Sequence, residues 1–304
     1  MAGGVDVASA AVGKVGAGRK QPADASGETR RARRRPGLGR LVIATIAAIL
    51  STFPVGFMLS GSLKTRGEFL ENPFGLPHEL TLENFTGLIH SEFGKYFLNS
   101  IVIAIVTVTG TVALAVLAAY SLSRFRTRLN TPMMLVFLAG IMVPVHVTLI
   151  PIYVLTQQLR MYDSIIGLFG PYIAFNLPIA VFVLASFFRQ IPKSLFEAAK
   201  IDGAGHWRIL RSVVVPMSGP AISTVAVITY IFVWNEFVFA LVLLSSTINY
   251  PLPLGLNAFY GEFSVNIPGM MAALAVATLP SFLFFLAAQE RVVSGLAAGA
   301  LHGE

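Results

Sequence analysis

Long apolar runs separated by short polar segments dominate the chain. A helix needs about 20 apolar residues to cross a bilayer core of roughly 30 Å, so runs of that length predict membrane spans. Six runs qualify: 41–63, 97–122, 132–154, 165–188, 217–244 and 270–289. Pro and Gly interrupt several of them, which membrane helices tolerate when neighbouring helices satisfy the freed backbone groups. The pattern predicts an all-α integral membrane protein with six transmembrane helices.

Composition narrows the class of protein further. The 304 residues are 55% hydrophobic and 12% charged, which excludes an ordinary soluble domain. The chain has no cysteine, which excludes disulfides and thiolate catalysis, and its five histidines are scattered. No nucleophile–base pair and no metal-ligand cluster emerges. We therefore expect no catalytic residues and no metal site, and an integral-membrane enzyme is disfavoured.

The first 39 residues differ from the rest of the chain. They are rich in Ala, Gly and Arg and nearly lack large apolar residues after position 15, which predicts a disordered basic tail. We expect a retained first transmembrane helix over 40–64, because its apolar run exceeds the roughly 7 to 15 residues of a signal-peptide core. An extracytoplasmic loop over 65–96 follows. The run RRARRR is interpreted as a topogenic signal, with lipid binding as the alternative.

Basic residues are distributed unevenly between the loops. Lysine and arginine favour the cytosolic side of a membrane protein. With the N-terminus inside, 18 of the 22 lysines and arginines are cytosolic, and four lie outside: Lys64, Arg66, Lys95 and Arg160. Both termini are then cytosolic, including a tail at 291–304. This orientation accounts for the net charge of +7 without a nucleic-acid partner.

A charged segment between the fourth and fifth runs predicts a short cytosolic helix. The segment is SLFEAAKIDGAG, and it follows Pro192. Ser194 and Glu197 predict a capping box at its start, and Gly203 offers the left-handed conformation that ends a helix. A helix of about eight residues is marginal in water unless something packs against it. We expect it to dock, either on the chain's own cytosolic surface or on a partner.

The longer segment EAAKIDGAGHWRILRSVVVP resembles the EAA loop of permease subunits of binding-protein-dependent ABC importers. Five residues match the family's spacing: Glu197, Ala198, Ala199, Gly203 and Pro216. Two depart from it, with Val213 in place of isoleucine and Val215 in place of leucine. The segments ENFTGLIHSEFGKYFLNSI, AAYSLSRFR and IFVWNEFVFALVLLSS are similar to the carbohydrate-uptake branch, the maltose-type permeases. The resemblance covers the chain from about residue 40 onward.

This resemblance implies a fold, a location and partners. It implies the type I ABC importer permease fold in a bacterial plasma (inner) membrane, with a permease core at 97–290 and the EAA loop at 189–213. The EAA helix would dock on a cytosolic ATPase through five residues: Glu197, Ala198, Ala199, Asp202 and Gly203. Further partners would be a second permease in a heterodimer, a second ATPase subunit, an extracytoplasmic solute-binding protein, lipid and a sugar.

ATP is expected to bind elsewhere than on this chain. The sequence lacks the GxxxxGK[ST] loop that cradles nucleotide phosphates. We therefore expect this chain to bind no cofactor, and ATP and magnesium to lie on the partner ATPase.

Polar residues within the spans are candidates for the substrate pathway. Glu236, in VWNEF, lies about midway along the fifth run, where a charge is costly and normally faces a cavity or a partner. With Trp234 and Asn235 it is a candidate to bind sugar hydroxyls or to gate, and the alternative is a structural hydrogen bond to the neighbouring subunit. Asn176, in AFNLP, is a candidate for substrate contact or for a hydrogen bond between helices.

An ion-coupled secondary transporter is the alternative function. Such a protein is expected to place carboxylates in several spans and to show an inverted repeat. Glu236 is the only acidic residue clearly within a predicted span, and we find no repeat. The sequence therefore favours the permease subunit of an ATP-driven importer of sugars or oligosaccharides.

Overall fold

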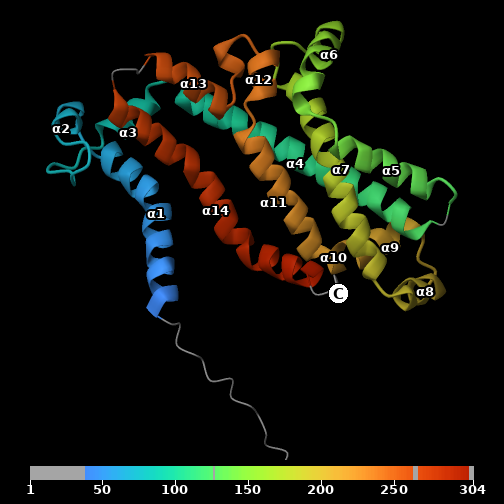
Figure 1. Ribbon diagram of the computed structural model, residues 1–304. Helices are drawn as coiled ribbons and strands as arrows, with labels where there is room; N and C mark the ends of the chain where they lie inside the picture. Colours follow the sequence, from blue (N-terminus) through green and yellow to red (C-terminus); the bar gives the residue numbers. More distant parts are fainter. Residues whose placement is uncertain (1–37, 126, 263–265, 301–304) are drawn as a thin grey trace, which may run out of the picture. The chain divides into compact units, whose positions relative to one another are not determined.

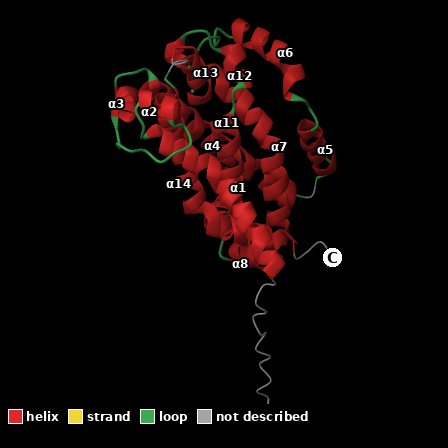
Figure 2. Ribbon diagram, turned by 60° about the vertical axis from the view of Figure 1, so that its left-hand side comes forward, coloured by secondary structure: helices red, strands yellow, loops and turns green. Residues whose placement is uncertain are grey.

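The computed structural model describes residues 38–125, 127–262 and 266–300, of which 258–262 and 287–300 by backbone alone. Every regular element in these residues is helical (Figure 2). Two compact units divide the chain at residues 49 and 50, inside α1 (Leu38–Ser62). The described part of the first unit is the N-terminal half of α1. The predicted basic tail lies outside the described residues up to position 37.

Four helices are long and apolar enough to cross a membrane. They are α1, α4 (Phe93–Arg124), α7 (Ile166–Gln190) and the stretch Ile267–Leu286 of α14 (Ile267–Ala300). Proline lies inside α1, α7 and α14, as the sequence predicts for helices whose neighbours stabilise them. The backbone of α14 continues to residue 300, beyond the predicted end of the sixth span.

The third predicted span is a bent pair of helices. α5 (Asn130–Ile141) and α6 (Val145–Gln158) meet at an angle of 99°. Pro144 occupies the position before α6 with an extended ψ of 129°, and its ring has no N–H to continue a helix from α5. The span predicted over 132–154 is therefore present as two helices, and the proline interruption expected in it is a sharp break at Pro144.

The fifth span is interrupted twice. A bend of 78° at Ser218 separates residues 206–217 from α11, and α11 itself ends before Glu236. The predicted span 217–244 is therefore divided, with one break at Ser218, near its start, and a second at Glu236. The pieces are α9 (His206–Ile209), a π-helical turn (Leu210–Val214), α10 (Val215–Met217), α11 (Gly219–Asn235) and α12 (Val238–Leu243). With each bent pair counted as one span, the described residues contain the six predicted spans.

The short helices gather at the two ends of the span bundle in residues 50–304. One end, at the top of Figure 1, carries α6, α12 and three further helices, whereas α8 (Lys193–Ile201), α9 and α10 lie at the other. The three further helices are α2 (Arg66–Glu71), α3 (Glu83–Ile89) and α13 (Leu252–Glu262). A 3₁₀ turn, Thr247–Asn249, lies between α12 and α13.

The core follows the contact between α4 and α7, the most extensive helix pair in the described residues. Buried alanines on both helices, such as Ala115, Ala119 and Ala185, allow the close backbone approach that membrane helices use. Two apolar clusters lie along this pair. One contains Tyr172 and α12, and the other contains Phe188 and α8.

Candidate functional site

The break between α11 and α12 lies at Glu236. α11 ends at Asn235, and Glu236 follows with an extended backbone (φ −68°, ψ 128°). The Glu236 side chain is 8% exposed, which is low for an acidic residue. Glu236 therefore follows a helix end, whereas the sequence places it about midway along the fifth run.

The carboxyl group of Glu236 holds this break together. Its Oε1 accepts a hydrogen bond from the backbone N–H of Phe239 at 2.8 Å, and its Oε2 is 3.4 Å from that of Ala240. These N–H groups belong to the first turn of α12, which has no partners of its own within the helix. The Tyr172 hydroxyl donates to Oε2 at 2.5 Å. One side chain thus closes the start of α12 and ties it to α7.

The other pathway candidates bond within the chain. The Trp234 indole N–H donates to the carbonyl of Ala277 at 3.2 Å, which joins α11 to α14. The amide of Asn176 donates to the carbonyl of Tyr172, one turn earlier in α7, at 2.8 Å. This bond of Asn176 lies within α7.

Tyr172 is the residue that sequence reasoning missed. It is fully buried, its hydroxyl contacts Glu236, and its carbonyl accepts from Asn176. Tyr172 thus bonds to two of the candidates, to Glu236 through its hydroxyl and to Asn176 through its backbone carbonyl. Asn235 lies apart: its side chain is exposed and bonds to the carbonyl of Ile231 in its own helix. The only signal in the sequence is a tyrosine within an apolar run, four residues before Asn176.

The start of α8 differs from the prediction. The helix begins at Lys193 with Pro192 at the N-cap position, and no side chain caps it. Ser194 therefore lies inside the first turn, where its hydroxyl is not placed to cap the helix, and the predicted Ser194–Glu197 capping box is wrong. The reason is local: Pro192 (φ −55°, ψ 135°) already has the extended ψ that precedes a first helical residue.

The end of α8 is as the sequence predicts. Gly203 has φ +75°, in the left-handed region. Its N–H donates to the carbonyl of Lys200 at 3.0 Å, and the N–H of Ala204 donates to that of Ala199 at 2.9 Å. These two bonds form a Schellman motif, which satisfies carbonyls that the helix end leaves free.

α8 has one face on the protein and one face open. Phe196 is buried, and the guanidinium carbon of Arg124, at the end of α4, lies 3.5 Å from its ring centroid. Arg124 also donates to the carbonyls of Phe188 and Ile191, so α4, α7 and α8 meet at this one side chain. On the open face Ile201 is 86% exposed.

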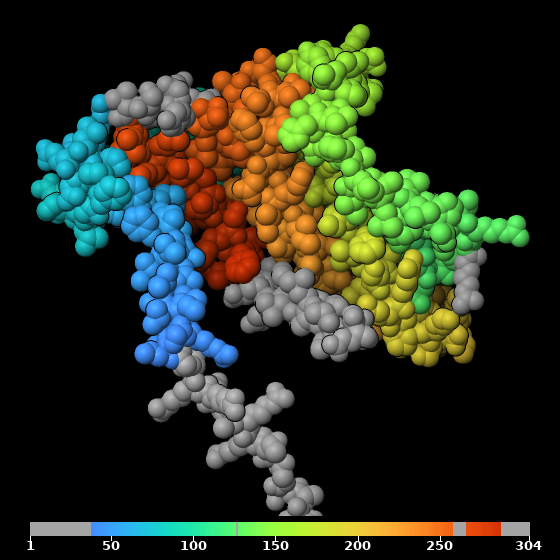
Figure 3. Space-filling view, viewed as in Figure 1, coloured from blue at the N-terminus to red at the C-terminus, as the bar shows by residue number. Residues whose placement is uncertain are grey.

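The predicted docking residues divide between these faces. Ala199 is half-buried against the protein, whereas Glu197, Ala198, Asp202 and Gly203 are exposed. Figure 3 shows α8 at the edge of the surface, at the end of the unit away from α12 and α13. The exposed set and the apolar open face make this a candidate docking surface.

The loop that follows α1 folds around Lys64, at the end of the residue 50–304 unit opposite α8. Lys64 is fully buried, and its ammonium group donates to the carbonyls of Asn72 at 2.7 Å, Pro73 at 3.4 Å and Gly75 at 2.6 Å. The Asn84 amide donates to the carbonyl of Lys64 at 2.9 Å. A charged residue that the sequence analysis treats only as an orientation signal is therefore the centre of a loop's hydrogen bonds.

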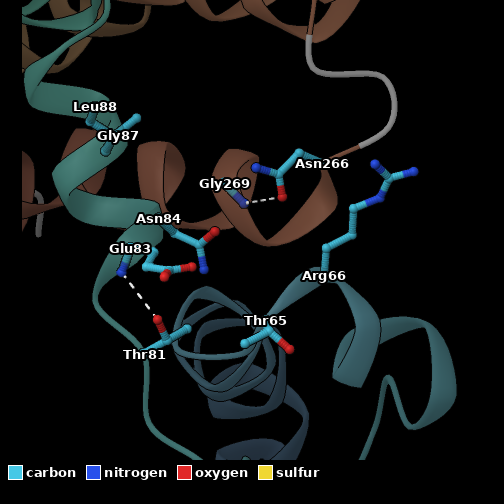
Figure 4. Close-up of a pocket in the computed structure, with 9 residues that line it drawn as sticks. All are labelled: Thr65, Arg66, Thr81, Glu83, Asn84, Gly87, Leu88, Asn266 and Gly269. Carbon is cyan, nitrogen blue, oxygen red and sulfur yellow. Dashed lines mark hydrogen bonds between the residues drawn. The ribbon is translucent and has the colours of Figure 1, made fainter.

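A small polar cavity adjoins this loop. Its volume is about 250 Å³ (Figure 4). Asn84 and Glu83 of α3 line it, and Asn266 lies beside the start of α14, where its Oδ1 accepts from the N–H of Gly269 at 3.2 Å. The Asn84 and Asn266 side chains bond to near neighbours there, so these two lining residues belong to the framework of the surrounding loops.

Asp163 ties two loops together at the same end. Its carboxylate accepts from the backbone N–H groups of Ser245 at 2.9 Å and Ser246 at 2.8 Å, and from the Ser246 hydroxyl. The hydroxyl bond first, and then the two backbone bonds, hold the pKa of Asp163 at about 2, below its ordinary value of 3.8. In the described part of the chain, no three His, Asp or Glu residues gather as metal ligands would.

Comparison with known proteins identifies the family. Residues 111–297 match the family of binding-protein-dependent transport system inner membrane components. An ABC transporter permease protein, ORF2, of Caldicellulosiruptor sp. (strain Rt8B.4) is 38% identical over 86% of this chain and 96% of that protein. The trehalose/maltose transport system permease protein MalG of Thermococcus litoralis is 34% identical over 87% of this chain and 96% of that protein.

A solved structure shares the fold. It is a chain of a bacterial ABC transporter involved in the import of the acidic polysaccharide alginate, with a TM-score of 0.74 at 23% identity, and the match covers 84% of this chain and 95% of that one. The all-helical architecture with six spans is thus the type I ABC importer permease fold. On the family match and these relatives, the chain belongs to the inner membrane components of binding-protein-dependent transport systems.

Proposed function

We propose that this chain is the translocation subunit of an ATP-driven importer of sugars or oligosaccharides. The observation that carries the proposal is α8, a nine-residue helix that packs on its own chain through Phe196 and leaves an apolar face open. Support for a sugar comes from the names of its relatives, one a trehalose/maltose permease and one an alginate importer.

Coupling to ATP would pass through α8. In this proposal the open face, with Ala198, Asp202 and Gly203 at its exposed positions, docks on a separate ATPase that binds ATP and magnesium, and this chain catalyses nothing. Glu197 and Ala199 contribute from the flank. A movement of α8 would reach α4 and α7 together, because Arg124 contacts Phe196 and bonds to two carbonyls at the end of α7.

The proposed assembly has further subunits. A second, different permease would complete the translocation pathway, two ATPase subunits would dock on the paired α8 helices, and a solute-binding protein would deliver the sugar at the opposite side. The proposed site is a bacterial plasma membrane with both termini in the cytosol. In this orientation α8 is cytosolic, and the loop around Lys64 is extracytoplasmic.

Cysteine labelling tests the orientation. The chain has no cysteine, so single cysteines report one site each. Glu79→Cys, at an exposed position, should react with a membrane-impermeant maleimide in intact cells. Arg128→Cys, which is also exposed and lies outside the proposed ATPase contact, is the matched control and should react only after permeabilisation. The reverse pattern would overturn the proposed orientation.

Uptake by the reconstituted assembly tests the function. The full chain, purified from native membrane with its bound subunits, is placed in vesicles with labelled maltose or trehalose and the copurified binding protein. Uptake should require ATP on the side of the membrane on which α8 lies. It should persist when ionophores remove ion gradients. Uptake that needs an ion gradient and ignores ATP would replace this proposal with the ion-coupled alternative.

A further inference from the structure

A cavity of about 510 Å³ lies between α8 and the adjoining ends of α4 and α7. Residues 193, 196, 197 and 200 of α8 line it, a spacing that places them on one face of the helix. This face is distinct from the open face of α8, on which Ile201 lies. The cavity thus belongs to a flank of α8 that shares only Glu197 with the proposed ATPase contact.

Positive charge is in excess around the cavity. Four of its lining residues are basic, Arg124, Arg189, Lys193 and Lys200, and Glu197 is its one acidic lining residue. The two ion pairs in the described part of the chain both lie within residues 68–95, far from this cavity along the chain. Each of the four cations therefore lacks a carboxylate partner among the described residues, and an anion in the cavity would gain from all of them.

Arg124 is fixed in place before any ligand arrives. Its guanidinium lies over the Phe196 ring and donates to two carbonyls of the α7–α8 connection. Its Nε is buried and has no hydrogen-bond partner in the described part of the chain. A buried N–H of this kind costs free energy unless an acceptor reaches it. The guanidinium is thus oriented, and it contributes its positive charge to the cavity that it lines.

We propose that this cavity binds the phosphate group of an anionic phospholipid headgroup. The proposal rests on the orientation proposed above, which places the cavity at the cytosolic ends of two spans, where headgroups lie. Arginine and lysine together suit a phosphate oxyanion, and basic cavities between helix ends on the cytosolic side are typical headgroup sites. The shared chemistry is a phosphate oxyanion, whose sources are the lipid or free inorganic phosphate.

Lipid retention by the full chain tests the proposal. The probes are phosphatidylglycerol and phosphatidylcholine at equal amounts in nanodiscs, and native mass spectrometry counts the lipids that stay bound after release. The test variant is Arg189→Gln/Lys193→Gln/Lys200→Gln, because these three side chains are exposed and their replacement leaves the core intact. We expect the wild-type chain to retain phosphatidylglycerol preferentially, and the variant to lose that preference by at least about tenfold.

A second triple variant separates a site from general surface charge. Arg128→Gln/Arg208→Gln/Arg211→Gln removes the same charge from exposed positions on the same side, outside the cavity lining. It should retain the preference. Equal loss in both variants, or a wild-type chain with no preference over phosphatidylcholine, would overturn the proposal.

Two further measurements test whether free phosphate or the ATPase competes with the lipid for this cavity. Displacement of phosphatidylglycerol by millimolar inorganic phosphate would support the phosphate site and show that a free anion fills it. Phosphatidylglycerol present on the isolated chain but absent from the assembly with its ATPase would overturn the lipid site in favour of a protein contact. These readouts need no transport, so they stand apart from the uptake assay that tests the proposed function.

Discussion

The break between α11 and α12 and the short helix α8 each carry a glutamate, and the two glutamates differ in burial and in hydrogen bonding. Glu236 is buried, and its carboxyl group accepts from Tyr172 and from the first turn of α12. Glu197 is exposed on α8, where it caps nothing. At Glu236 the hydrogen-bond partners of the carboxyl group all belong to this chain. At α8 one helix face and the Glu197 carboxylate are left exposed. Polar residues beside apolar runs thus mark either a fixed joint or a surface for a partner, and burial distinguishes the two.

The largest effect should come from Glu236→Ala. This change leaves the Tyr172 hydroxyl and the Phe239 N–H buried without their acceptor, which should cost about 3 kcal/mol of folding stability. We expect a lower thermal unfolding midpoint in detergent and a lower level in the membrane. An unchanged midpoint would mean that the α11–α12 break does not depend on this carboxyl group.

Two matched variants separate the bonds of Glu236. Glu236→Gln keeps one acceptor oxygen and nearly the same volume, so it should cost less than alanine, about 1 to 2 kcal/mol. Tyr172→Phe removes the donor from α7 and keeps the bond to α12. If Glu236→Gln and Glu236→Ala destabilise the protein equally, the single acceptor oxygen that Gln keeps contributes nothing to the stability of the α11–α12 break.

Gly203→Asp should impair transport more than stability. Nothing lies within 4 Å of a Cβ placed on Gly203, so its φ of +75° is the only local source of strain, about 1 kcal/mol. We expect near-normal membrane level with weak retention of the ATPase, measured by copurification. Gly203→Asn is the control, because asparagine adopts this conformation more readily and lacks the charge. Normal ATPase retention in Gly203→Asp would remove α8 from the proposed contact.

Asp163 is a third carboxylate, and its stabilising hydrogen bonds should depend on pH. Its pKa of about 2 lies below the ordinary 3.8, so its stabilising effect is present above about pH 4 and is lost as pH falls through about 2. Asp163→Asn should therefore increase protease cleavage between residues 159 and 166 above pH 4. The difference from wild type should vanish toward pH 2, as a limited-proteolysis series with an acid-active protease would measure. A difference that is independent of pH would assign the effect to packing.

The smallest effects should come from the start of α8. Because no side chain caps this helix, Ser194→Ala should change folding stability by no more than about 0.5 kcal/mol. Glu197→Ala should do the same, while any change in ATPase retention reports the proposed contact. A stability loss above 1 kcal/mol in either variant would restore the capping box that the structure lacks.

The sequence predicts the spans well and the breaks poorly. Apolar run length finds the helices, because crossing a bilayer imposes a minimum length, and the glycine signal finds the end of α8. It misses the ends of α5 and α11, because proline and glutamate within an apolar run are compatible with either a tolerated kink or a true break. It misses Tyr172 because the acceptor that makes this residue important lies 64 positions away, and only the fold brings the two together.

The buried Lys64 gives the protein an internal reporter of loop integrity. Its amine is fully enclosed and bonded to backbone carbonyls, whereas the Lys95 side chain is 55% exposed. An amine-reactive footprinting reagent should therefore modify Lys95 quickly and leave Lys64 unmodified while the loop is folded. The ratio of the two modified peptides in a mass spectrum would then measure, in any detergent or lipid preparation, what fraction of the molecules retains a native loop.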